Sequence, residues 1–189
     1  MRGEALALRA FLHFDLLRLF GPIYKEEPNA KAIAYRTTYD RVPTPILTAQ
    51  AVVEAVLKDL HESEDLLKSS DPLDFFTDPY DEGYKSKNAF LINREFRMNL
   101  FAVKAMLARV YCYKGDAESK ALALKYAREV IDANQHFKLI DAQSAANYNS
   151  IRYSEQIFGL SVYELDKLLT ANGMDAEGER SDMHYTTSE

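Results

Sequence analysis

The sequence contains no tryptophan and only one cysteine, Cys112, among its 189 residues. A single cysteine cannot form a disulfide within the chain, so cysteine usage leaves the cellular compartment open. Cys112 lies among alanines in a helical pattern, which predicts a small buried side chain rather than a reactive thiol. Glycine and proline are also scarce, with seven and six residues. These scarcities favour a folded, largely helical chain.

Long uncharged apolar runs and an excess of basic residues are missing as well. No stretch of about 18 apolar residues is present, so the sequence has no segment suited to span a bilayer. Met1 leads within a few residues into a charged amphipathic helix, and no secretion signal is visible. The formal net charge of −6 argues against nucleic acid or anionic lipid as a partner, because either would need a basic face. With 47% hydrophobic residues, the chain can form one domain with a core.

The strongest pattern lies in residues 97–134, which predict two amphipathic helices joined by a tight reversal at Lys114-Gly115-Asp116. Apolar or small residues recur every three or four positions: Leu100, Val103, Leu107 and Val110; Ala105, Ala108 and Cys112; and, on the second helix, Leu124, Ala127, Val130 and Ile131. Gly115 permits the reversal, and Asp116 can begin the next helix. The sequence A-x2-Y-x3-G-D followed by A-x3-A is typical of a tetratricopeptide-like helical hairpin. Such a repeat is a scaffold whose surface binds another molecule, which argues for binding rather than catalysis.

Two more helices are predicted at residues 3–20 and 48–68. The first carries two apolar stripes, which are Leu6, Ala10, Phe14 and Leu17, and Leu8, Leu12, Leu16 and Leu19. Two stripes predict neighbours on two sides, so we expect the chain to be part of a longer protein that continues before Met1. Gly21-Pro22 is expected to end this helix. Thr48 is the expected N-cap of the other helix, whose main face is formed by Val52, Val56, Leu60 and Leu67.

The segments between these helices have no sustained periodicity. Residues 22–47 contain four of the six prolines, and residues 69–93 are also irregular. The end of the chain is polar and aperiodic. The sequence therefore predicts an all-α fold of tetratricopeptide-like helical hairpins with long irregular loops, with a helical-repeat core at residues 1–165 and a flexible or truncated tail at residues 166–189.

Four blocks of this sequence, in this order, resemble a known family. They are GEALALRAFLHFDLLRLFGPIY, VVEAVLKDLHESEDLL preceded by Arg41, RMNLFAVKAMLARVYCYKGDAESKALALKYAREVID, and SEQIF. The combination resembles the SusD/RagB family of nutrient-binding lipoproteins from the outer membrane of Bacteroidetes, over about residues 3–165. The resemblance covers only part of a family member, because family members are longer at the C-terminal end. The family's signal peptide and lipidated cysteine are also missing from this sequence.

The resemblance implies a surface-exposed outer-membrane lipoprotein that binds oligosaccharides or similar nutrients. It also implies a partner, a SusC-like TonB-dependent transporter that receives the nutrient. Family members are helical binding proteins and not enzymes, and no cofactor is implied. Their ligand residues do not belong to fixed motifs, so none can be assigned here from the resemblance.

The candidate glycan-binding residues come from chemistry. Sugar rings present apolar C–H faces to aromatic side chains and hydroxyl groups to amides and carboxylates. Two loop clusters offer these groups, the first being Phe75, Phe76, Tyr80, Tyr84 and Asp81, and the second Tyr35 and Tyr39, with Tyr24 nearby. The competing interpretation is that the aromatic residues anchor long loops onto the helices while the acidic residues are solvated.

No pattern for metal binding or catalysis stands out. Asp74, Asp78, Asp81 and Glu82 are hard oxygen ligands, but their spacing matches no calcium loop. The four histidines, His13, His61, His136 and His184, are scattered and lack zinc-ligand spacing. No phosphate-binding loop or nucleophile elbow is present. Arg109 is expected to form a buried structural ion pair, and His13 to belong to a polar stripe.

Three hypotheses about function remain. One of them, an enzyme with an unrecognised site, has no positive evidence, and the other two are binding functions of different classes. The first is the glycan-binding component, which needs exposed tyrosines on the long loops. The second is a helical-repeat adaptor that binds a peptide in a concave groove, which needs polar residues on the inner helix faces. Because the inner faces are alanine and leucine while the loops carry the aromatic residues, the sequence favours glycan binding.

Overall fold

Four α-helices and one pair of short strands form the part of the chain that the structure describes. The structure is a computed structural model, and it describes residues 1–71, 94–137, 139 and 155–159. Met1–Gly159 forms one compact unit, and Leu160–Glu189 is a second unit that lies outside the described residues. The predicted boundary at residue 165 and the predicted tail also lie outside them and stay predictions.

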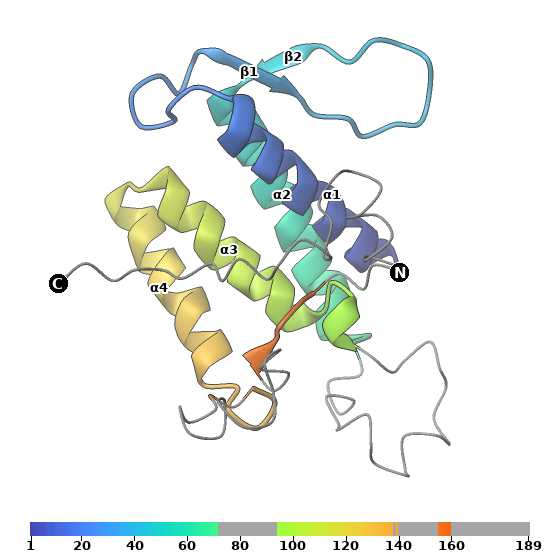
Figure 1. Cartoon of the computed structure of the whole chain (residues 1–189), viewed down its shortest axis with the longest axis vertical. Helices are drawn as coiled ribbons and strands as arrows, with labels where there is room; N and C mark the ends of the chain where they lie inside the picture. Colours follow the sequence, from blue (N-terminus) through green and yellow to red (C-terminus); the bar gives the residue numbers. More distant parts are fainter. Residues whose placement is uncertain (72–93, 138, 140–154, 160–189) are drawn as a thin grey trace, which may run out of the picture. The chain divides into compact units, whose positions relative to one another are not determined.

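The helices pair in sequence order, as Figure 1 shows. Helix α1 (Arg2–Phe20) lies beside α2 (Ala49–Lys68), while α3 (Leu100–Lys114) and α4 (Ala117–Ile131) form a hairpin that packs on α2 through α3. A short 3-10 helix, η3 (Arg94–Phe96), precedes α3. This arrangement confirms the predicted all-α class and the helical hairpins.

Residues close to each helix end account for where the helices begin and stop. Gly115 adopts the left-handed conformation (φ 77°) after α3, which a side chain would disfavour. Asp116 then caps α4 by accepting the backbone N–H of Ser119 at 2.8 Å. Thr48 caps α2 through the N–H of Ala51 at 3.2 Å, as predicted. Gly21 follows α1 with an extended backbone.

The core lies where α1, α2 and α3 meet. It combines small residues on α1 with branched residues on α2 and α3, so the helices approach closely. Its fully buried members are Ala7, Ala10, Phe14 and Leu17 of α1, Ala49, Val52, Val53, Val56 and Leu60 of α2, and Val103, Leu107 and Val110 of α3.

Residues 22–47 are not wholly irregular, which corrects the prediction for this segment. Strand β1 (Lys31–Ala34) pairs antiparallel with β2 (Ile46–Thr48), with an irregular register between them. The two strands lie at the end of the α1–α2 pair where α1 stops and α2 begins (Figure 1). They close a long loop, residues 35–45, which projects from the helices.

Three predictions about helix faces were wrong. Leu124 and Ile131 are 53% and 73% exposed, because α4 packs instead through Ser119, Leu122 and Tyr126. Cys112 is exposed, since it lies nine residues and about 180° around the helix from the buried Val103.

The second stripe of α1 is also exposed in the described structure. Leu12 and Leu19 are 57% and 73% accessible to solvent, and Leu8 and Leu16 are exposed as well. Within the described residues, the side of α1 that carries Leu12, Leu16 and Leu19 is therefore not covered, and the predicted neighbour on this side is not among them.

Candidate functional site

The described part of the predicted site is the loop between β1 and β2, residues 35–45, called the β1–β2 loop below. It contains the candidate residues Tyr35 and Tyr39. The other candidates, Phe75, Phe76, Tyr80, Asp81 and Tyr84, lie outside the described residues.

Tyr35 and Tyr39 have different environments. Tyr35 is buried, and its hydroxyl donates to Asp59 Oδ2 at 2.6 Å. Burial, together with the hydrogen bond to Asp59, raises the pKa of Tyr35 well above its ordinary value. Tyr39, in contrast, is fully exposed. The structure therefore places Tyr35 at the base of the loop and Tyr39 on its exposed surface.

A charged pair between α1 and α2 supports the base of this loop. Arg9 of α1 donates from Nε and Nη2 to the two carboxylate oxygens of Asp59 on α2, at 2.7 and 2.8 Å. The same guanidinium lies 3.4 Å from the carbonyl oxygen of Thr37. Asp59 thus accepts from both Arg9 and Tyr35, which fixes the first residues of the loop to both helices.

His13 also contacts the loop and is more than a member of a polar stripe. Its Nδ1 lies 2.8 Å from the carbonyl oxygen of Arg9, and its Nε2 lies 3.1 Å from the backbone nitrogen of Arg36. The imidazole ring lies against the ring of Tyr35, with 4.3 Å between centroids.

Arg36 organises the rest of the loop. Its guanidinium donates to the carbonyl oxygens of Thr38 and Val42 at 3.0 and 2.9 Å and to Thr44 Oγ1 at 3.0 Å. It also donates to Asp40, both to the carbonyl oxygen and to Oδ1. These five contacts match the five N–H groups of a guanidinium, so Arg36 has its donors engaged within the loop.

Asp40 completes this local network. It accepts the Thr38 hydroxyl at 2.7 Å and the Val42 N–H at 2.9 Å. These two bonds, with a smaller effect of Arg36, hold the pKa of Asp40 below its ordinary value. Asp40 is therefore ionised at neutral pH and remains exposed to solvent.

The loop surrounds a depression of about 300 Å³. Its lining includes the candidate residue Tyr35. Hydroxyl and carboxylate groups come from Thr37, Thr38, Asp40 and Thr44, and apolar groups from Val42, Pro43, Pro45 and Leu47. This mixture of acceptors, donors and apolar surface suits a polar, uncharged ligand with C–H faces.

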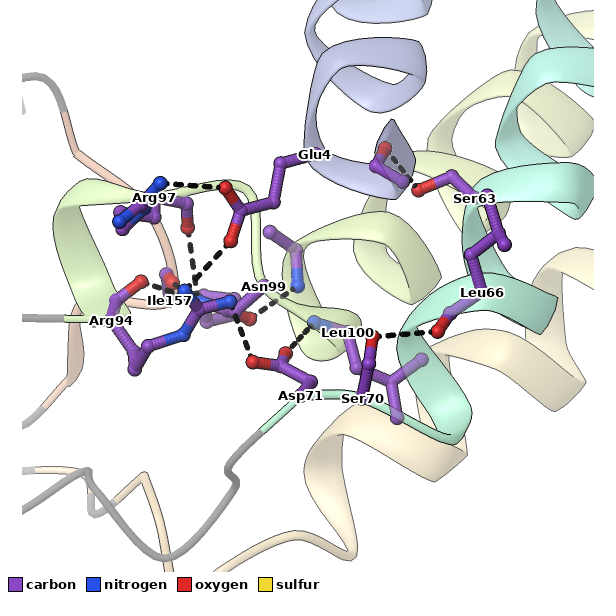
Figure 2. Close-up of polar contacts among 12 residues, drawn as sticks. Glu4, Ser63, Leu66, Ser70, Asp71, Arg94, Arg97, Asn99, Leu100 and Ile157 are labelled. Carbon is purple, nitrogen blue, oxygen red and sulfur yellow. Dashed lines mark hydrogen bonds and ion pairs between the residues drawn. The ribbon is translucent and has the colours of Figure 1, made fainter. Parts of the chain in front are cut away.

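A second polar cluster, centred on Arg94, is buried instead of exposed (Figure 2). Arg94 is 2% exposed and its guanidinium lies 2.7 Å from Glu4 Oε1 and 2.5 Å from Asp71 Oδ1. Arg97 reaches the other oxygen of Glu4 at 2.9 Å, and Asn99 donates to the carbonyl oxygen of Ile157 at 2.7 Å. Burial is the largest influence on Glu4 and opposes ionisation, but the two arginines outweigh it and lower its pKa.

The Arg94 network joins segments that are far apart in sequence. It connects the start of α1, the end of α2, η3 and residues 155–159, and Asp71 also accepts the N–H of Leu100 at the start of α3 at 2.7 Å. Its arginines and carboxylates pair with one another, so removal of one partner would leave a buried charge unpaired. The sequence gives no local signal for it.

The remaining sequence candidates have simple outcomes. Arg109 pairs with Asp15 at 3.4 Å and is 43% exposed, so the ion pair exists but the expected burial was wrong. Within residues 1–71, 94–137, 139 and 155–159, no cluster of three or more histidine, cysteine or acidic side chains could hold a metal ion. The acidic residues Asp74, Asp78, Asp81 and Glu82 lie outside the described residues. The described helices include none long and apolar enough to cross a membrane.

Comparison with known proteins identifies the fold. No protein-family model matches the chain, and no curated protein matches it. A SusD-like carbohydrate-binding protein of Bacteroides vulgatus ATCC 8482 has a similar structure, with a TM-score of 0.60, 20% identity, and coverage of 85% of this chain and 30% of that chain.

Two SusD superfamily proteins have similar structures too. One, from Bacteroides thetaiotaomicron VPI-5482, has a TM-score of 0.57 and 22% identity over 77% of this chain and 27% of that one. The other, from Bacteroides vulgatus ATCC 8482, has a TM-score of 0.52 and 24% identity, and the match covers 75% of this chain and 28% of that chain. The chain thus has the fold of part of a SusD superfamily protein, as the sequence resemblance implied, and spans less than a third of the length of each.

Proposed function

We propose that this protein binds oligosaccharides and that the β1–β2 loop forms part of the binding surface. The observation that carries the proposal is the fold shared with a SusD-like carbohydrate-binding protein. The fully exposed ring of Tyr39, between Thr38 and Asp40, which both line the depression, supports it. An aromatic face of this kind can pack against the C–H face of a sugar ring, while the neighbouring threonine hydroxyls bind the sugar hydroxyls.

The groups that line the depression favour neutral sugars over acidic ones. Of the two arginines in the loop, Arg36 has its five donors engaged by loop oxygens, and Arg41 is exposed. The lining of the depression contains the carboxylate of Asp40 and neither arginine. A uronic acid or sulfated sugar in the depression would bring a second negative charge toward Asp40.

The second loop cluster remains part of the proposal. Phe75, Phe76, Tyr80, Asp81 and Tyr84 have the aromatic and acidic chemistry of a sugar site, and they belong to a different connection. We propose that they supply further contacts to the same ligand class.

The cellular role follows from the resemblance. The protein is proposed to be a surface-exposed outer-membrane lipoprotein, not an enzyme, that passes its oligosaccharide to a SusC-like TonB-dependent transporter. Binding and release without a chemical step would be sufficient for this role.

Isothermal titration of the chain against panels of neutral and acidic oligosaccharides tests the proposal. Binding of a neutral member, weakened about tenfold in Tyr39→Ala by loss of the aromatic contact, is the expected result. Phe20→Ala, which removes an exposed aromatic ring outside the loop, is the control and should leave affinity unchanged. Tyr80→Ala and Tyr84→Ala test the second cluster in the same way.

Two outcomes would contradict the proposal. Equal affinity in Tyr39→Ala and the unmodified chain would remove the β1–β2 loop from the site. Binding of extended peptides but no oligosaccharide would favour the peptide adaptor instead.

A further inference from the structure

We propose that His13 is a pH-sensitive positioning residue that holds the β1–β2 loop only while its ring is neutral. Its importance for ligand binding rests on the function proposed above. The hydrogen bonds of the ring carry the proposal, because they allow only one protonation state.

The partner of each ring nitrogen determines where the hydrogen lies. The backbone nitrogen of Arg36, 3.1 Å from Nε2, can only donate, so Nε2 must accept with its lone pair. The carbonyl oxygen of Arg9, 2.8 Å from Nδ1, can only accept, so Nδ1 must carry the hydrogen. His13 is therefore a neutral imidazole with its hydrogen on Nδ1.

Protonation would break the contact to the loop. A hydrogen added to Nε2 would point at the N–H of Arg36, which replaces an attractive contact with two opposed donors. Histidine is the side chain that ordinarily changes charge between about pH 5 and pH 8. The contact is thus present while the ring is neutral and is lost when the ring is protonated.

The charged groups on the elements around His13 are engaged with one another. Arg9 on α1 and Tyr35 both donate to Asp59 on α2, and Arg36 donates to Asp40 in the loop. Among the described residues, neither carboxylate is hydrogen-bonded to the imidazole.

Loss of this one contact would affect the whole loop. The N–H that His13 accepts belongs to Arg36, whose guanidinium holds Thr38, Asp40, Val42 and Thr44. The neighbouring Tyr35 ring packs on the imidazole. Release of the ring would therefore loosen the base of the depression and increase the motion of the loop that carries Tyr39.

NMR spectroscopy of the full 189-residue chain, without any sugar, tests this proposal. Nitrogen-15 spectra of the imidazole should show hydrogen on Nδ1 and not on Nε2 at pH 8. The exchange protection of the Arg36 amide, corrected for the intrinsic pH dependence of exchange, should fall about tenfold from pH 8 to pH 5, as expected for loss of one hydrogen bond.

His13→Gln is the informative variant, because its amide oxygen can reach the position of Nε2 and does not titrate. In this variant the Arg36 protection should stay high and nearly constant over the same pH range. His61→Gln is the matched control, since His61 contacts Tyr111 and not the loop, and it should retain the tenfold change.

Hydrogen on Nε2 in the unmodified chain, or Arg36 protection that does not change with pH, would overturn the proposal. So would a tenfold change that persists in His13→Gln. The tautomer measurement needs no variant, so it decides the proposal even if a substitution prevents folding. Because no sugar is used, failure of glycan binding would leave these results unaffected, and the two proposals can fail separately.

Discussion

Arg94 and Arg36 each form several contacts, but their partners differ in distance along the chain. The partners of Arg94 include Glu4, 90 residues away, and its side chain is 2% exposed. The side-chain partners of Arg36 lie within eight residues, and its side chain is 38% exposed. One arginine therefore joins distant segments of the core, while the other gives local order to a surface loop. A loop ordered from within can present a ligand surface without contributing much to the stability of the fold.

The largest effect in this comparison is expected from Arg94→Ala. It would leave two buried carboxylates, Glu4 and Asp71, without their shared cation, which typically costs about 3–5 kcal/mol. Urea unfolding measures this loss, with Arg18→Ala as the control. Arg18 pairs with Asp15 at the surface, where an ion pair contributes about 0–1 kcal/mol. Equal losses in the two variants would contradict the structural role of Arg94.

The pH dependence of stability offers a second, intermediate test. The pKa of Glu4 in the folded protein lies below its ordinary value of 4.5. Its ionised form therefore contributes stability above about pH 4.5, and this contribution is lost as the pH falls through the lower folded value. Urea unfolding at pH 7 and pH 3 should show a smaller acid-induced loss in Glu4→Gln than in the unmodified chain. An identical loss would mean that Glu4 is not held by Arg94 and Arg97.

The smallest effect on stability is expected from Arg36→Ala. Its contacts are exposed and local, so the free energy of unfolding should fall by only about 1 kcal/mol. The oligosaccharide affinity should fall much more, because residues 37–44 would lose their common partner. Titration calorimetry and urea unfolding of the same variant measure both quantities. A large loss of stability with unchanged affinity would reverse the roles assigned to the two arginines.

Local features of this fold could be predicted from the sequence, and distant ones could not. Gly115, Asp116 and Thr48 act on the residues next to them, so their helix ends were predicted correctly. The face of α4 was misassigned, because Tyr126 takes the core position and its hydroxyl reaches Glu64 on α2 at 3.2 Å. No pattern along one helix contains that contact.

The candidate site shows the same limit. Composition singled out Tyr35 and Tyr39 equally, since both are tyrosines on one proline-rich loop. Only the fold distinguishes them, because the Tyr35 hydroxyl meets Asp59, which is 24 residues away in sequence. Arg36 and His13 were also missed as loop residues, because neither has a motif and both act through backbone groups.

An NMR titration with the tightest-binding neutral oligosaccharide of the panel locates the binding surface on the chain. We expect shift changes in the amides of Thr37, Thr38 and Tyr39, and none in those of Arg94 and Asn99. Changes at Arg94 and Asn99 with none between residues 35 and 45 would contradict binding at the β1–β2 loop.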